Sequence, residues 1–286
     1  MTTPASKAPM ISAASARVEV ARCRAMLYSA LAQSLSAPTR SLCDAVNHGE
    51  MSRLAEHAVA QLPASHTRGM DRVFLKQLSW ATEAGSAEDV LGMEYTRLFA
   101  LNVHCPQYEA DYLGRNSFHW SQVISGVSSM YSVFGVQLGE GVAERPDHIA
   151  VELDFMNLLT AREARARELN KRERTRVYRQ AEKMFFASHL ARWGVSFARR
   201  LREETRLDFY NGIGLLLETF LYAEGRRLKT ELADPDASAQ TNDDAPQRGT
   251  VAACGCNENA TKQSELVQVN PITAESRHSE SFHGKE

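Results

Sequence analysis

The stretch Phe186-Ala-Ser-His-Leu190-Ala-Arg-Trp193-Gly-Val-Ser-Phe197-Ala-Arg-Arg-Leu201 carries a large apolar side chain at every third or fourth position. An α-helix turns once every 3.6 residues, so side chains at this spacing lie on one face of the helix. That face is stable only when other apolar residues cover it. We therefore predict one long helix over this stretch, buried along one side.

The same apolar spacing occurs in other parts of the chain. The stripes are Leu27, Leu31 and Leu35; Leu91, Tyr95 and Leu98; Trp120, Val123, Val127, Met130 and Phe134; Ile149, Leu153 and Met156; and Tyr210, Ile213, Leu217 and Phe220. Alternating patterns of four or more residues, which would indicate strands, are absent from the sequence. The sequence therefore predicts an all-α fold, a single globular bundle of about eight helices.

The ends of the chain differ in composition from its middle. After Leu232 there are nine Asp and Glu residues against four Lys and Arg, and few bulky apolar residues. Such a segment cannot bury enough apolar surface to offset the entropy that it would lose on ordering. We expect a helical domain over residues 14–231, a disordered N-terminus over residues 1–13 and a disordered acidic tail over residues 232–286.

Several classes of protein are disfavoured by composition. The 286 residues have a formal net charge of −2, whereas a dedicated nucleic-acid binder is usually strongly basic. No run of 18 apolar residues is present, so we expect no membrane span. The N-terminus lacks the apolar core of a secretory signal, and five scattered cysteines do not suggest a disulfide scaffold. A reducing cytoplasm fits best.

The usual catalytic and metal-binding motifs are missing. The sequence has no G-x-x-x-x-G-K-[ST], G-x-S-x-G, H-E-x-x-H or C-x-x-C, and no spacing that suits four zinc ligands. We therefore expect no resident metal or cofactor. Cys254 and Cys256 form the one close thiol pair, which is either a soft-metal or redox site or two incidental thiols.

Residues 161–206 are strongly basic, with 14 Lys and Arg against 6 Asp and Glu. Such a segment can attract an acidic partner or nucleic acid. It can equally be the solvated face of two helices, with ion pairs between successive turns. Aromatic residues do not interleave with the basic ones as a nucleic-acid platform would require, so we favour the solvated face.

Two short segments are candidates for binding. Tyr95, Leu98 and Phe99 share a helix face and precede the irregular segment 102–112, which is dense in aromatic and charged residues. These residues either pack in the core or form the rim of a binding site.

The second segment, Glu144-Arg-Pro-Asp147-His148, comes directly before a helical stripe. We expect Asp147 to cap that helix. His148 would then lie in the first turn, neutral and able to make hydrogen bonds.

Four motifs in order resemble those of one family. Tyr95-Thr-Arg-Leu98-Phe99 is similar to Y/W-x-x-L-F, and Pro106-Gln-Tyr108-Glu109-Ala-Asp-Tyr112 to P-x-Y-E-S-x-Y. Glu144-Arg-Pro-Asp147-His148-Ile149 with Glu152-Leu-Asp-Phe-Met156 resembles E-P-x-D-H-I…E-L-x-F-M. Phe186-Ala-Ser-His189-Leu190 with Trp193 and Phe197 is similar to F-x-x-H-L-x-x-W-x-x-x-F. Together they resemble the TorD/DmsD/NarJ family of redox-enzyme maturation chaperones, over residues 20 to 225.

The resemblance implies an all-helical cytoplasmic chaperone that is not an enzyme. Its partner would be the apo catalytic subunit of a molybdopterin oxidoreductase of the DMSO-reductase superfamily, with its twin-arginine signal peptide, until the cofactor is inserted. It implies a client site at Tyr95, Leu98, Phe99, Pro106, Tyr108, Asp147 and His148. Glu109, Asp111 and Glu144 are further candidates for an acidic rim around an apolar groove. The protein would be a monomer or a homodimer.

Two positions depart from the family pattern, and two other functions stay open. Arg145 stands where the pattern has its proline, which has moved to Pro146, and Ala110 replaces a serine. The alternatives are a guanine-nucleotide-binding protein, for which the sequence has no glycine-rich phosphate loop, and a nucleic-acid-binding regulator that uses residues 161–206.

Overall fold

The computed structural model describes residues 12–64, 87–101, 103–113, 117–138, 144–233 and 267–269. Within these ranges the chain forms ten α-helices, one π-helical turn and one pair of three-residue strands. The predicted all-α fold is confirmed. None of the described helices is both long and apolar enough to span a membrane.

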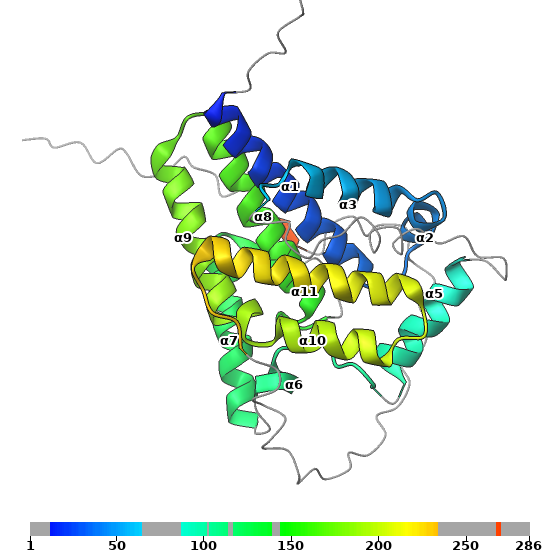
Figure 1. The fold of residues 1–286 in the computed structure, drawn as a ribbon. Helices are drawn as coiled ribbons and strands as arrows, with labels where there is room; N and C mark the ends of the chain where they lie inside the picture. The colour runs from blue at the N-terminus through cyan, green and yellow to red at the C-terminus, as the bar shows by residue number, and fades with distance from the viewer. Residues whose placement is uncertain are drawn as a thin grey trace, which may run out of the picture.

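The elements follow one another along the chain as Figure 1 shows. The helices of the first half are α1 (Ala13–Ser34), α2 (Arg40–Asn47), α3 (Glu50–Gln61), α5 (Ala87–Tyr95), η2 (Thr96–Ala100), α6 (Ala110–Leu113) and α7 (Ser117–Val133). After strand β1 (Val136–Leu138) come α8 (Ile149–Glu168), α9 (Arg172–Ser188), α10 (Leu190–Glu204) and α11 (Asp208–Leu228). Strand β2 (Val267–Val269) follows much later.

Two long helix pairs build the core. Helix α1 packs along α8, and α10 packs along α11 in front of them (Figure 1). The predicted apolar stripes supply the contacts between the pairs, since their residues are almost all buried in one continuous cluster. The stripes therefore identified the buried side of α1, α8, α10 and α11 correctly.

The helix predicted over residues 186–201 is in fact two helices. Helix α9 ends at Ser188 and α10 begins at Leu190, because the backbone of His189 leaves the helical region with φ −126° and ψ −90°. The apolar stripe continues across this break, so spacing alone could not reveal it. The imidazole of His189 instead lies 2.7 Å from the buried carboxylate of Glu109.

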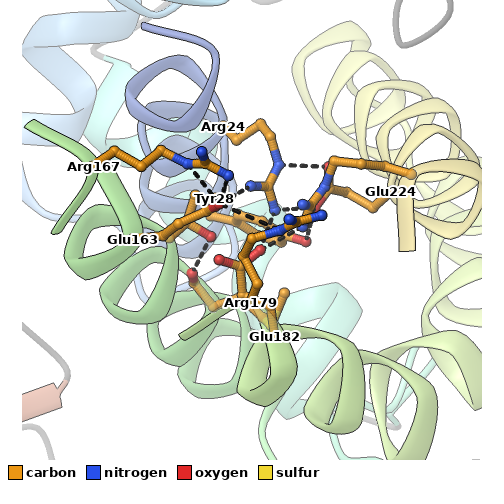
Figure 2. Close-up of polar contacts among 10 residues, drawn as sticks. Arg24, Tyr28, Glu163, Arg167, Arg179, Glu182 and Glu224 are labelled. Atoms are coloured by element: carbon orange, nitrogen blue, oxygen red, sulfur yellow. Dashed lines mark hydrogen bonds and ion pairs between the residues drawn. The ribbon is translucent and has the colours of Figure 1, made fainter. Parts of the chain in front are cut away.

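A buried ion cluster connects four of the long helices (Figure 2). The guanidinium of Arg24 on α1 donates to Glu224 on α11 at 2.7 Å, to Glu182 on α9 at 2.8 Å and to Glu163 on α8 at 3.2 Å. All four side chains are at most 2% exposed. The cluster is therefore a buried polar contact between helices inside an apolar core. Each of its charges is stabilised by the opposite charges beside it.

More arginines complete this cluster from its edge. Arg227 pairs with both Glu182 and Glu224, and Arg167 donates to Glu163 at 2.9 Å (Figure 2). Although burial opposes ionisation, the positive charges of Arg227 and Arg24 lower the pKa of Glu224 to about 2. The Glu224 carboxylate is therefore ionised at neutral pH, deep in the protein.

The C-terminal segment that we expected to be disordered lies largely outside the described residues. Leu232 packs against the core, and the amide of Ala233 donates to the carbonyl of Ala191 at 2.8 Å. Further on, β2 pairs antiparallel with β1, with Val136 opposite Val269 and Leu138 opposite Val267. The folded part therefore extends slightly beyond residue 231, and one short apolar piece of the segment forms a strand.

Candidate functional site

The carboxylate of Asp147 lies at the centre of the candidate site, completely buried. Arg145 donates two hydrogen bonds to this carboxylate, from Nε to Oδ1 at 3.0 Å and from Nη2 to Oδ2 at 2.8 Å. The backbone amide of Ala110 donates to the same Oδ2 at 3.2 Å. Asp147 therefore fixes the segment before α8 to the segment before α6.

The prediction that Asp147 caps α8 is wrong, because His148 does so. The Nδ1 atom of His148 accepts the amide of Ala150 at 3.1 Å, so His148 occupies the cap position and not the first turn. An imidazole that accepts at Nδ1 is neutral and carries its proton on Nε2. Burial lowers the pKa of His148 to about 4, which agrees with the neutral ring that we predicted.

This lowered pKa makes stability depend on pH. The unfolded chain takes up the His148 proton near pH 6.5, whereas the folded protein does so only near pH 4. Stability should therefore fall as pH is lowered from about 6.5 to 4, by roughly 3 kcal/mol if this site acts alone.

The variant His148→Asn keeps a capping oxygen and has no such proton. We expect urea denaturation at several pH values to give a smaller fall for this variant than for the wild type. Identical pH profiles would show that His148 is not buried as described.

Members of all four motifs meet around this point. The backbone of Tyr108 forms a bridge with that of His148, and their rings stack edge to face with centroids 5.1 Å apart. The amide of Glu109 donates to the carbonyl of Asp147 at 2.9 Å. Tyr95 donates its hydroxyl at 3.3 Å to Gln107, next to this bridge.

A buried polar network continues inward from Glu109. Its carboxylate bonds to His189, and the indole of Trp193 donates to Glu152 at 3.3 Å. Burial, with the negative charge of Glu109 as a second cause, raises the pKa of Glu152 well above its usual value. These residues hold α8, α10 and the segment before α6 together, so they position the site from inside.

Only part of the predicted site is accessible to a partner. Leu98, Glu109, Asp147 and His148 are at most 1% exposed, so their side chains are covered in the free protein. The side chains that are partly accessible are Tyr95, Phe99, Pro106, Tyr108 and Glu144, while Asp111 is exposed. The surface that we call the aromatic rim consists of these six residues.

Two residues that the sequence does not indicate as site residues, Arg145 and Trp120, lie beside the aromatic rim. The guanidinium of Arg145 lies 4.2 Å from the ring centre of Tyr108 and 5.8 Å from that of Trp120 on α7. In the sequence, Trp120 is part of an apolar stripe, and Arg145 stands where the family pattern has its proline. The side chains of Met93, Leu101, Val103 and Phe118, which flank the rim in sequence, are also strongly exposed for apolar residues.

The basic segment 161–206 lies on α8, α9 and α10. Part of it lines a cavity of about 520 Å³ together with the end of α11, and the six basic residues there are Arg172, Arg176, Arg179, Lys183, Arg227 and Lys229. Three of these arginines already pair with Glu side chains. The solvated face with ion pairs therefore describes much of this segment.

Metal binding finds no support in the part of the chain that the structure describes. No group of three or more His, Cys, Asp or Glu side chains there could hold a metal ion. The predicted thiol pair, Cys254 and Cys256, lies outside the described residues.

Comparison with known proteins agrees with the four motifs. Residues 64–199 match the family described as nitrate reductase delta subunit. The chain is 26% identical over 113 residues to the chaperone protein TorD of Vibrio parahaemolyticus serotype O3:K6 (strain RIMD 2210633), which covers 40% of this chain and 51% of that protein. It is 30% identical over 99 residues to the chlorate reductase assembly chaperone protein of Ideonella dechloratans, which covers 34% of this chain and 50% of that protein.

The chain spans about half the length of these two curated relatives. The matched family region contains the segments of Tyr95, Tyr108, Asp147 and His189. The motifs, the helical fold, the family match and both relatives agree, and the chain resembles the TorD/DmsD/NarJ family of redox-enzyme maturation chaperones.

Proposed function

We propose that the protein is a cytoplasmic chaperone for a molybdopterin oxidoreductase of the DMSO-reductase superfamily. It binds the apo catalytic subunit and its twin-arginine signal peptide, keeps the subunit ready for cofactor insertion and delays its export. It is not an enzyme, it binds no nucleic acid, and it acts as a monomer or homodimer. The names of the family and of both relatives support this assignment.

The observation that carries the proposal is the aromatic rim itself. Segments far apart in the sequence meet where Tyr108 pairs with His148, and a network of buried charged groups fixes this meeting point from below. Partly exposed aromatic rings stand beside Glu144 and Asp111 at the surface. A signal peptide brings arginines and an apolar stretch, and such a surface offers both carboxylates and apolar contact.

The charged groups around Tyr108 are mostly carboxylates. Burial raises the pKa of Tyr108, and the neighbouring carboxylates of Glu144, Asp147 and Asp111 raise it further, while Arg145 opposes them. The charged groups near Tyr108 are therefore three carboxylates and one internal guanidinium, a set that is negative on balance. A peptide with two arginines suits this balance of charge better than an acidic peptide would.

The proposal is tested by calorimetric titration of a twin-arginine signal peptide into the wild type and into Tyr108→Leu. We expect the variant to bind about 10-fold or more weakly, because it lacks the ring on which an arginine or an apolar side chain can pack. A peptide with two lysines in place of the arginines should bind the wild type more weakly.

The matched control is Tyr178→Leu, which changes the same residue type at a distant place. Tyr178 packs against Phe134, directly after the end of α7 at Val133, whereas Trp120 lies near the start of that helix, roughly 20 Å from Val133 along its axis. This variant should bind the peptide as the wild type does. Equal affinities for Tyr108→Leu and the wild type, with equal thermal stability, would exclude the aromatic rim as the peptide site.

A further inference from the structure

The side chain of Arg145 is held as a bound arginine ligand would be held. Its guanidinium makes two hydrogen bonds to the buried carboxylate of Asp147 and lies over the ring of Tyr108, with the ring of Trp120 further away. A carboxylate with two accepting oxygens and an aromatic face are the two features that recognise a guanidinium. These residues thus form a complete guanidinium subsite.

The occupant of this subsite is more exposed than the carboxylate that it binds. Asp147 is completely buried, whereas the side chain of Arg145 is 35% exposed. Arg145 also stands at the one position where the chain departs from the E-P-x-D-H pattern, in which a proline could not offer any charged group. Tyr108 and Asp147 therefore belong to the motifs that resemble those of the family, whereas Arg145 departs from the pattern.

A buried carboxylate without a cationic partner is strongly unfavourable. Arg145 can therefore leave Asp147 only when another cation takes its place, and the fork of a second guanidinium is the group that best matches the two bonds. The exchange keeps Asp147 paired throughout. It also lets the guanidinium of Arg145 move into water, where its charge is well solvated.

We propose that Asp147, Tyr108 and Trp120 form a guanidinium subsite, which Arg145 fills in the free protein and from which an arginine of the client displaces it. This inference rests on the proposed function for the identity of the incoming arginine. The internal arginine lowers the affinity for every competing ligand, because each must first displace it. A peptide that also gains apolar contact along the rim overcomes this competition, and a lone arginine does not.

The test compares Arg145→Gln with the wild type in titrations of the twin-arginine peptide and its twin-lysine analogue. Removal of the competitor should strengthen binding of the twin-arginine peptide by about 10-fold or more, the scale of a charged hydrogen bond. The twin-lysine peptide should gain much less, because an ammonium cannot form the paired bonds. Arg145→Lys should lie between Arg145→Gln and the wild type.

A second measurement works without any peptide. Arg145→Gln leaves Asp147 without a guanidinium partner, so the melting temperature of this variant should fall. N-methylguanidinium should restore that melting temperature by entering the vacated subsite. The same compound should not raise the melting temperature of the wild type or of the double variant Arg145→Gln, Asp147→Asn. This melting measurement stays informative even when Arg145→Gln is only marginally stable, because it records the rise in melting temperature that the added compound causes.

The outcomes separate this inference from the proposed function. If the wild type and Arg145→Gln bind the twin-arginine peptide equally, the subsite is wrong while the proposed function stands. If neither protein binds the peptide but N-methylguanidinium restores Arg145→Gln, the subsite stands and the proposed client is wrong. Weaker peptide binding by a folded Arg145→Gln would overturn the displacement, since Arg145 would then assist binding.

Discussion

Replacement of Arg24 by methionine is expected to lower the free energy of unfolding by about 3–5 kcal/mol. Methionine fills a similar volume but leaves the carboxylates of Glu163, Glu182 and Glu224 with fewer cations inside the core. Removal of one partner from a buried ion cluster is costly because the remaining charges stay desolvated. The exposed Arg22, which pairs with Glu168, provides a matched control, and Arg22→Met should change stability only slightly.

The effect of Arg24→Met should also depend on pH. The pKa of Glu224 in the folded protein is lowered to about 2, so the stability that this carboxylate contributes is present above about pH 4.5 and is lost as pH falls toward 2. The difference between wild type and Arg24→Met should therefore shrink below pH 4.5. Urea denaturation at pH 7 and at pH 3 measures it, and equal losses for Arg24→Met and Arg22→Met would contradict the buried cluster.

Replacement of Trp193 by alanine is expected to cost a similar amount, about 3–5 kcal/mol. Trp193 is 1% exposed, its ring lies 5.2 Å from that of Tyr112 and 5.8 Å from that of Phe197, and its indole donates to Glu152. Alanine would leave a cavity and remove the hydrogen bond to a buried carboxyl group. A domain has only about 5–15 kcal/mol of stability, so the variant should be at the edge of unfolding.

The variant Trp193→Phe separates the two contributions. It keeps most of the apolar contact and loses the hydrogen bond, so it should be less destabilised than Trp193→Ala. Chemical denaturation with circular dichroism as the signal measures both variants. A denaturation midpoint unchanged in Trp193→Ala would place this side chain at the surface and remove the basis for the packing of α10.

The helices could be predicted from the sequence because each buries a stripe that obeys the helical period. The break at His189 could not, since Phe186, Leu190 and Trp193 keep that period across it. At the break, the imidazole of His189 contacts Glu109, which is 80 residues away in the chain. A pattern of spacing within one segment contains no information about such a partner.

For the candidate site, the sequence indicates which residues lie near one another but not which hydrogen bonds they make. The order of the motifs indicated correctly that Tyr108, Asp147 and His148 belong together. The sequence gives no means to decide which of two adjacent capping residues accepts the amide of Ala150, because both can do so. The decision follows from Arg145, which occupies the Asp147 carboxylate and leaves His148 to cap the helix.

We propose that this protein recognises a molybdoenzyme subunit before its cofactor is inserted. The most direct measurement is binding of the purified full chain to the apo and the cofactor-loaded forms of one catalytic subunit, by calorimetry, with candidates from nitrate, trimethylamine oxide and dimethyl sulfoxide reductase systems. We expect at least one apo subunit to bind at micromolar concentration or tighter, and its loaded form at least 10-fold more weakly. Equal binding of the apo and loaded forms, or no binding to any of the candidate subunits, would contradict the assignment.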